Sequence, residues 1–173
     1  FGDLYQNINQ MNLFISRTLH ADVLTESAKN YYLGQVYGLR AYYMYQLYRS
    51  WGDAVFTEEP SLGFEVGKLA KAATPAAEIF EQVKKDIESS LSYFGPDYTI
   101  KEKKSLWSKA ATLMLKADVY LWSAHRDGGE GDARTAKNAL VDIQNNISRS
   151  NLDLMDTYQG VFAYDNKGNK EII

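Results

Sequence analysis

The stretch from Glu26 to Asp53 constrains the fold more than any other, because its apolar residues repeat with a helical period on more than one face. The two repeating sets are Tyr32, Val36, Leu39, Tyr43 and Leu47 on one face, and Leu33, Tyr37, Ala41, Met44 and Tyr48 on another. A helix that is apolar on several sides is covered by neighbours. Gly52, which readily adopts a positive φ, ends the pattern. The sequence therefore predicts a long central helix, about 37 Å in length, against which other helices pack.

Four further segments have the apolar period of a helix. They are residues 4–19, 75–94, 105–123 and 133–147. The residues expected to face inward are Leu4, Ile8, Met11, Ile15 and Leu19 in the segment at 4–19, and Ala136, Ala139, Leu140, Ile143 and Ile147 in the segment at 133–147. The segment at 75–94 has clear end signals, because Thr74 is a favoured capping residue, Pro75 suits the first helical position and Gly95 follows the last apolar residue. The strict tetratricopeptide consensus is absent, and the connection over residues 55–73 is too long for an even array. We therefore predict an all-α fold, an irregular tetratricopeptide-like helical-repeat scaffold with about five main helices.

The two ends of the sequence indicate how it is organised. A length of 173 residues suits one domain. Phe1 is not a natural start, and the last residues, Asn169–Ile173, read as the opening of a strand. The sequence therefore predicts a single helical-repeat domain over residues 1–173, a strand that begins at residues 170–173, and a chain that is a fragment of a larger protein.

The composition argues against several classes of function. A net charge of −3 indicates no broad basic face, so nucleic acid is not an expected partner. With no cysteine, the chain has neither a disulfide framework nor a thiolate to act as a nucleophile or metal ligand. No run of 18 apolar residues is present, so no segment is expected to span a membrane as a helix.

No hydrolase elbow, P-loop, HExxH motif or dinucleotide fingerprint is found. The sequence HRDGGEGD at residues 125–132 predicts a loop. Its acidic residues, Asp127, Glu130 and Asp132, lack the spacing of an EF-hand, so a solvated loop is favoured over a cation site. His20 and His125 have no nearby nucleophile. We expect a protein that is not an enzyme and has no catalytic residue, metal site or cofactor.

Arg40 is unusual because it lies inside an apolar helical pattern. A buried guanidinium needs a carboxylate or several carbonyl groups, since its desolvation is otherwise too costly. Asp86 is the partner that we predict, and this pair would tie the central helix to the helix at residues 75–94. We favour this structural role for Arg40 over a role in ligand binding.

The sequence is rich in aromatic residues, with 13 Tyr and 3 Trp. Sugars present C–H faces that pack well on aromatic rings, while neighbouring polar groups bind their hydroxyls. Trp51 lies at the exit of the central helix beside Arg49 and Asp53, and these three residues form the candidate ligand-binding site. The simpler alternative is that Trp51 closes the end of the core. Trp107 and Trp122 follow the helical period and are expected to pack inside.

The segment Gly34–Asp53 resembles the helix signature of the SusD/RagB-like family. Arg40-Ala41, the aromatic run and Gly52-Asp53 are in register with that signature, whereas Gln35 replaces its usual Glu and no proline follows Gly-Asp. Three more family patterns follow in the expected order: a capped helix at 74–91, a helix rich in small residues at 105–123, and a tail with Leu154, Tyr158, Phe162 and 169–173. Because the patterns are in order across nearly the whole chain, the resemblance is specific.

The resemblance implies a function. Members of this family are lipoproteins of the outer-membrane surface that bind glycans or other nutrients and cap a SusC-like TonB-dependent transporter. It therefore predicts an oligo- or polysaccharide ligand, such a transporter as partner, and a place at the cell surface on the outer membrane. Only a lipid anchor outside this sequence would contact the membrane. The alternative interpretation is a helical-repeat adaptor that binds peptides in a groove.

Overall fold

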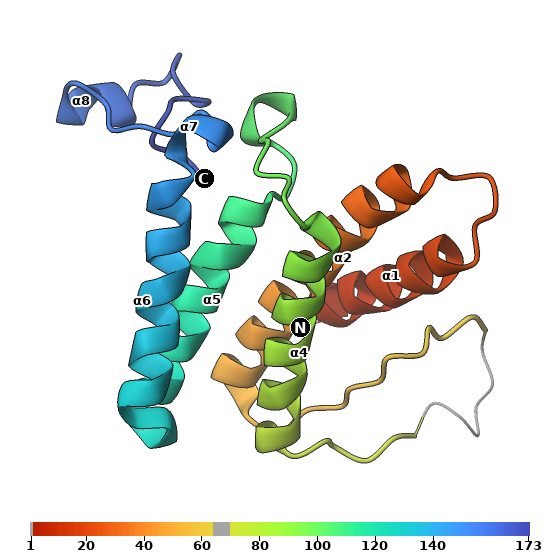
Figure 1. Cartoon of the computed structure of the whole chain (residues 1–173). Coiled ribbons are helices and arrows are strands. Elements are labelled where there is room, and N and C mark those ends of the chain that lie inside the picture. Colours follow the sequence, from red (N-terminus) through yellow and green to blue (C-terminus); the bar gives the residue numbers. More distant parts are fainter. Residues whose placement is uncertain (1, 64–69) are drawn as a thin grey trace. The chain divides into compact units, whose positions relative to one another are not determined.

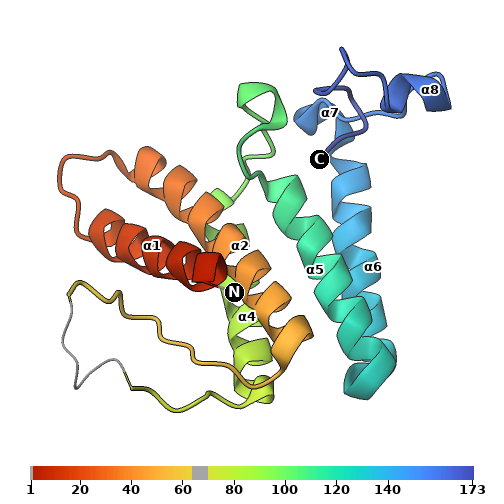
Figure 2. The same ribbon diagram turned by 180° about the vertical axis from the view of Figure 1, so that it is seen from behind.

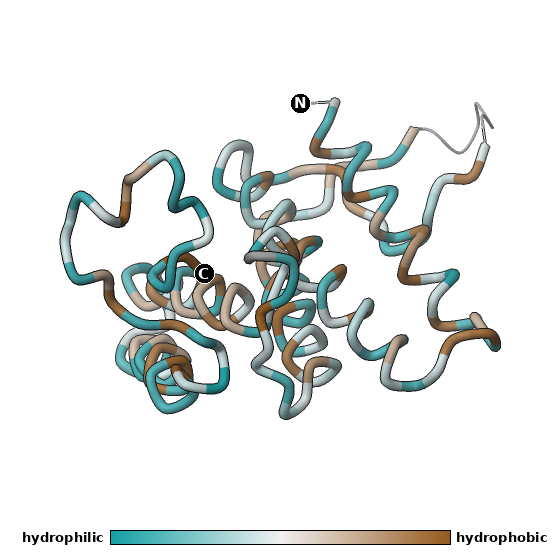
Figure 3. Tube along the Cα trace, turned by 90° about the horizontal axis from the view of Figure 1, so that it is seen from above, coloured by the Kyte–Doolittle hydropathy of each residue, from teal (hydrophilic) through white to brown (hydrophobic). Residues whose placement is uncertain are grey.

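The structure of the protein is a computed structural model that describes residues 2–63 and 70–173 (Figures 1 and 2). The described part is all-α, and its main helices are α1 (Gly2–Leu19), α2 (Glu26–Trp51), α4 (Ala76–Phe94), α5 (Lys109–Ser123) and α6 (Gly129–Asn145). Shorter helical segments are η1 (Glu102–Lys104), η2 (Ala124–Gly128), α7 (Ile147–Ser150) and α8 (Tyr158–Val161). Each main helix carries both apolar and polar positions (Figure 3). The prediction of an all-α helical scaffold is confirmed.

The chain divides into two compact units, residues 1–93 and residues 94–173. The first unit contains α1, α2 and α4, and the second contains α5, α6 and the short helical segments. The expectation that residues 1–173 act as one domain stays a prediction.

The helix α2 is the centre of the first unit, where α1 and α4 pack against it (Figures 1 and 2). Its most deeply buried apolar side chains, each 2% exposed or less, are Leu33, Ala41, Met44, Tyr45 and Leu47. The prediction of a central helix with neighbours on more than one side is confirmed. The predicted face that begins with Tyr32 is less buried than expected. Tyr32 itself is 41% exposed, because it lines an open groove beside α1.

The buried face of α1 is rotated from the predicted one. Its buried residues are Ile8, Asn12, Ile15 and Thr18. Leu19, which was expected to face inward, is exposed. A polar residue can occupy the inner face here because the side-chain oxygen of Asn12 accepts a hydrogen bond from Arg40 and its amide donates one to the carbonyl oxygen of Thr57.

Both ends of α2 are capped. The Thr25 hydroxyl accepts a hydrogen bond from the N–H of Ala28 at 3.3 Å, the usual role of an N-cap threonine. At the other end, Gly52 has a φ of +72° and donates its N–H to the carbonyl oxygen of Tyr48 at 2.9 Å. The predicted end of the central helix at Gly52 is confirmed.

The start of α4 differs from the prediction. The backbone of Thr74 pairs with that of Ala54 in an isolated bridge, with N–H···O distances of 2.9 and 3.2 Å. The first N–H of the helix, on Ala76, donates to Asp53 Oδ1 at 2.8 Å. The cap is therefore the Asp53 carboxylate rather than the predicted Thr74, because the bridge brings both ends of the long connection together. Residues 64–69 of that connection lie outside the described part of the chain.

Replacing Gly52 by alanine is expected to lower the free energy of unfolding by about 1–2 kcal/mol, because a Cβ makes a left-handed backbone costly. The added Cβ would meet only the Cβ of Ala76, at 3.9 Å, so backbone strain rather than a clash sets the cost. Gly131→Ala, at an open position inside α6, is the matched control and is expected to stabilise by about 0.5–1 kcal/mol. Urea denaturation measures both changes, and equal effects would contradict the role given to Gly52.

In the second unit, α5 and α6 lie side by side as an antiparallel pair (Figures 1 and 2). Their buried apolar residues are Ala110, Leu113, Leu115, Ala117 and Val119 on α5, and Ala136, Ala139 and Ile143 on α6. Small residues at several of these positions let the two helices approach closely. Leu140 and Ile147 were expected to face inward, but each is 38% exposed. Leu140 falls beside the narrow buried face of α6, and Ile147 lies beyond the end of α6, in α7.

The segment at residues 125–132 is helical rather than the predicted loop. The helical segment η2 ends at Gly128, and α6 begins at Gly129, whose φ of +55° marks the break between them. Glycine lowers helix propensity by only about 1 kcal/mol per residue. Helical neighbours on both sides therefore outweigh the glycines in this segment.

The strand expected to begin at residues 170–173 is not formed in this structure. These residues make a turn followed by an irregular end. A strand needs a neighbouring strand for its backbone hydrogen bonds, and the described residues contain none. Asn169 holds the turn instead: its buried amide donates to the carbonyl oxygens of Val161 at 3.0 Å and Asn166 at 2.9 Å.

Candidate functional site

A buried ion pair between Arg40 and Asp86 joins α2 to α4. Arg40 Nε donates to Asp86 Oδ2 at 2.6 Å, and Arg40 Nη2 donates to Asp86 Oδ1 at 2.7 Å. The two residues are 1% and 0% exposed. This bidentate geometry fits the planar fork of a guanidinium to a carboxylate. The predicted partnership is confirmed.

Other polar side chains complete the hydrogen bonding of this pair. Asn12 Oδ1, from α1, accepts a hydrogen bond from Arg40 Nη1 at 2.8 Å. The Asn12 amide donates in turn to the carbonyl oxygen of Thr57 at 2.6 Å. Gln82 Nε2 donates to Asp86 Oδ1 at 3.0 Å. One network therefore links the three helices of the first unit to the connection that follows α2.

The opposite charges of Arg40 and Asp86 stabilise each other in this network. Burial alone lowers the pKa of Arg40, but its hydrogen bond to Asp86 and the negative charges of Asp86 and Glu58 raise that pKa above its ordinary value. The pKa of Asp86 is raised above its ordinary value, because burial is the largest effect on it, while the hydrogen bonds from Arg40 and Gln82 act to lower it. Because three N–H groups and a cation meet this carboxyl group, hydrogen bonding stabilises its ionised form. Because Arg40 and Asp86 are both buried, their ion pair holds α2 and α4 together and offers no surface to a ligand.

The three residues of the predicted ligand site lie at the end of α2 and just after it. Trp51 is 48% exposed, so its ring only partly covers the end of the core. The guanidinium carbon of Arg49 lies 5.3 Å from the centroid of the Tyr45 ring. Asp53 caps α4 through Ala76. Arg49 and Asp53 thus have contacts within the fold, while Trp51 presents ring surface to solvent, and their role in ligand binding stays a prediction.

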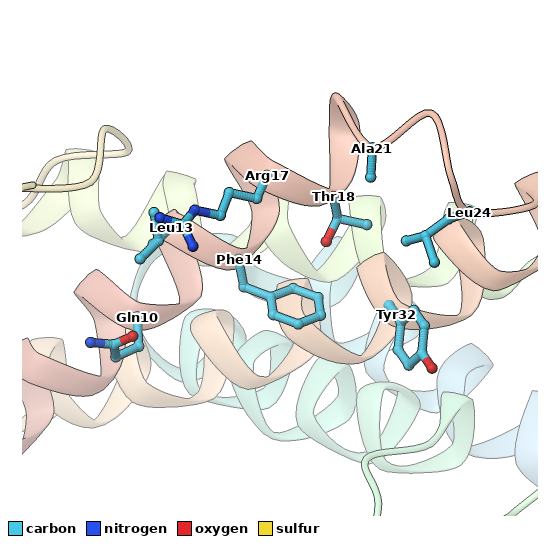
Figure 4. A pocket seen from close by; sticks show the side chains of 8 residues that line it. All are labelled: Gln10, Leu13, Phe14, Arg17, Thr18, Ala21, Leu24 and Tyr32. Carbon is cyan, nitrogen blue, oxygen red and sulfur yellow. The ribbon is translucent and has the colours of Figure 1, made fainter.

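A groove of about 610 Å³ runs between α1 and the start of α2 (Figure 4). It is lined by Gln10, Leu13, Phe14, Arg17, Thr18, Ala21, Leu24 and Tyr32. Phe14 is 42% exposed and meets Tyr32 edge to face, with ring centroids 6.2 Å apart and an interplanar angle of 73°. A concave surface with exposed rings and a few polar groups is the usual form of a small-molecule site.

Sequence reasoning missed this groove. The periodicity assigned Tyr32 to an inner face of the central helix, and Phe14 falls outside the apolar face predicted for α1. The available signal was the aromatic residue on the polar side of an amphipathic helix, since an exposed aromatic ring away from the core often marks an interaction surface.

Within residues 2–63 and 70–173, no group of three or more acidic or histidine side chains is placed to hold a metal ion. His20 directly follows the last residue of α1, and its Nδ1 lies 2.7 Å from the carbonyl oxygen of Ser16. His125 is exposed. No helix of the described part is both long enough and apolar enough to cross a membrane.

No family model matches the chain. Among curated proteins, SusD-like protein P25 of Formosa agariphila is 26% identical over 171 residues, which is 99% of this chain and 30% of that protein. Among solved structures, Bacteroides fragilis NanU superposes with a TM-score of 0.88 at 47% identity, over 97% of this chain and 32% of that chain. A SusD superfamily protein from Bacteroides vulgatus superposes with a TM-score of 0.86 at 42% identity, over 99% of this chain and 34% of that chain.

A laminarin-binding SusD-like protein shares the fold, with a TM-score of 0.80, at 20% identity and over 98% of this chain and 35% of that chain. This chain therefore spans about a third of the length of the relatives it matches. The four patterns found in the sequence, the arrangement of the helices and these similarities agree. The chain belongs to the SusD-like family.

Proposed function

We propose that this chain is part of a cell-surface component of a SusC/SusD-like uptake system that binds glycans or other nutrients. Membership of the SusD-like family supports this proposal, and the similarity to solved SusD superfamily structures over nearly the whole chain is the observation that carries it. The exposed rings of Trp51, Phe14 and Tyr32 are consistent with sugar binding, since a sugar's C–H face packs on such rings.

The proposal includes partners and a location. The ligand is an oligo- or polysaccharide or another nutrient, and the partner is a SusC-like TonB-dependent transporter that the protein caps. The protein sits at the surface of the outer membrane through a lipid anchor outside this chain. Its role is to bind and deliver a ligand without chemical change, so it is not an enzyme.

We assign the ligand platform to Trp51, with Arg49 and Asp53 as its polar neighbours. Trp51 supplies an exposed ring, and Arg49 is an exposed cation two residues before it on α2. Truncating an aromatic residue at the centre of a binding site typically costs more than about 1.4 kcal/mol, a factor of about ten in affinity. Trp51→Ala is therefore expected to weaken glycan binding about tenfold or more.

A glycan array probed with the protein identifies the ligand, and calorimetry with that glycan measures the affinity of each variant. Tyr158→Ala, which removes a ring that is 78% exposed in α8, is the control and should keep the affinity of the unchanged protein. Circular dichroism shows whether both variants stay folded. Unchanged affinity in Trp51→Ala would remove the platform, and binding to no glycan on the array would contradict the proposed glycan ligand.

A further inference from the structure

The groove between α1 and α2 has the size of a ligand site. Its volume of about 610 Å³ lies within the range of about 300–1,000 Å³ that is usual for small-molecule pockets. Both walls are helices of the same compact unit, and the α1–α2 loop closes one end through Ala21 and Leu24 (Figure 4). All of the residues that line the groove lie in the described part of the chain.

The aromatic pair in the groove is pre-arranged for a sugar ring. Phe14 and Tyr32 lie between the two helices in Figure 4, and their perpendicular contact holds both rings in place. Tyr31 supports Tyr32 from the next position on α2, with ring centroids 5.8 Å apart. Each exposed ring loses little side-chain freedom on binding, because an aromatic side chain has only two rotatable angles. The C–H face of a pyranose would pack against such a surface.

The charge of the groove sets a condition on the ligand. Arg17 and Gln10 lie on the same face of α1 as Phe14, three and four residues from it. Arg17 is exposed and forms no ion pair with another described residue, and no acidic side chain lines the groove. A guanidinium without a carboxylate partner favours a planar anion that it can bind in bidentate fashion.

We propose that this groove is a subsite for a sugar that carries a carboxylate. The sugar ring packs on Phe14 and Tyr32, the carboxylate binds the Arg17 guanidinium, and Gln10 meets a hydroxyl. This inference rests on the proposed function, because it names the class of glycan that the protein takes. It differs from the Trp51 platform in place and in charge requirement.

Titration of the protein with methyl glucuronoside, methyl glucoside and acetate, followed by amide and Arg Nε NMR signals, tests the proposal. The two glycosides have the same ring and differ only in the carboxylate. We expect the glucuronoside to shift the signals of Phe14, Arg17 and Tyr32 and to bind about tenfold more tightly than the glucoside, which lacks the charged hydrogen bonds. Acetate alone should bind weakly, since it has no ring to pack.

Variants separate the two parts of the site. Arg17→Gln should bring the affinity for the glucuronoside down to that for the glucoside, while Phe14→Ala should weaken the binding of both. Arg134→Gln, at an exposed arginine of α6, is the matched control and should change neither. Equal binding of the two glycosides to the unchanged protein, an unaffected Arg17→Gln variant, or signal shifts confined to other residues would each overturn the proposal.

The same measurements distinguish this inference from the function on which it rests. If glycans on the array bind but the signals of the groove do not move, the subsite is wrong and the proposed function stands. If the glucuronoside shifts the groove signals but none of the oligo- or polysaccharides binds, the subsite stands and the proposed uptake of oligo- or polysaccharides is contradicted.

Discussion

Replacing Asp86 by leucine is expected to lower the free energy of unfolding by about 3–5 kcal/mol, because the buried Arg40 guanidinium loses its two shortest hydrogen bonds and keeps only the half-exposed Glu58 carboxylate, 3.6 Å from Nη2. Arg40 is 1% exposed and gives two hydrogen bonds to Asp86, so water cannot replace the lost partner. Arg40→Met should cost a similar amount, because it leaves the Asp86 carboxylate buried. The double variant should cost much less than the sum of the two, because it removes both charges together.

Urea denaturation of the four proteins completes a double-mutant cycle and gives the coupling between Arg40 and Asp86. Lys170→Ala is the control: its ammonium lies 3.6 Å from Asp153 Oδ2, and the two side chains are 49% and 66% exposed. Such a surface pair is worth about 0–1 kcal/mol. If Asp86→Leu cost no more than Lys170→Ala, or if the two single changes simply added, the structural role of the buried pair would be wrong.

Arg40 and Asp86 could be paired from the sequence because each violates the pattern around it. A cation in an apolar helix must have an anion, and Asp86 is an acid among the inward positions of the next helix. Asn12 could not be foreseen as the third member, because asparagine is mostly found on protein surfaces. Its place in the core depends on how α1 crosses α2, and local periodicity carries no information on that crossing.

The errors of sequence reasoning have a common physical cause: contacts between residues that are distant in the sequence override the local signals. Thr74 has the chemistry of a cap, but Asp53 takes that position because a bridge between distant residues brings it to α4. The glycines before residue 132 indicate a loop, yet η2 ends at Gly128 and α6 begins at Gly129, so the packing of α5 on α6 leaves only a break at Gly129 between two helical segments. The groove also belongs to this class, since Phe14 and Tyr32 meet only through the contact of two helices.

Replacing Met44 by alanine is expected to lower the free energy of unfolding by about 2–5 kcal/mol, because the change opens a cavity beside the C-terminal half of α2. Met44 is 0% exposed, and helices pack on α2 from more than one side, so the surrounding side chains have little room to close in. Met114→Ala is a matched control on α5, where the same atoms are removed from a side chain that is 43% exposed. Both substitutions change helix propensity equally, so the difference between the two in urea denaturation measures burial alone. If the two variants lost the same stability, α2 would not be the buried centre of its unit, and the fold assigned to the first 93 residues would have to be revised.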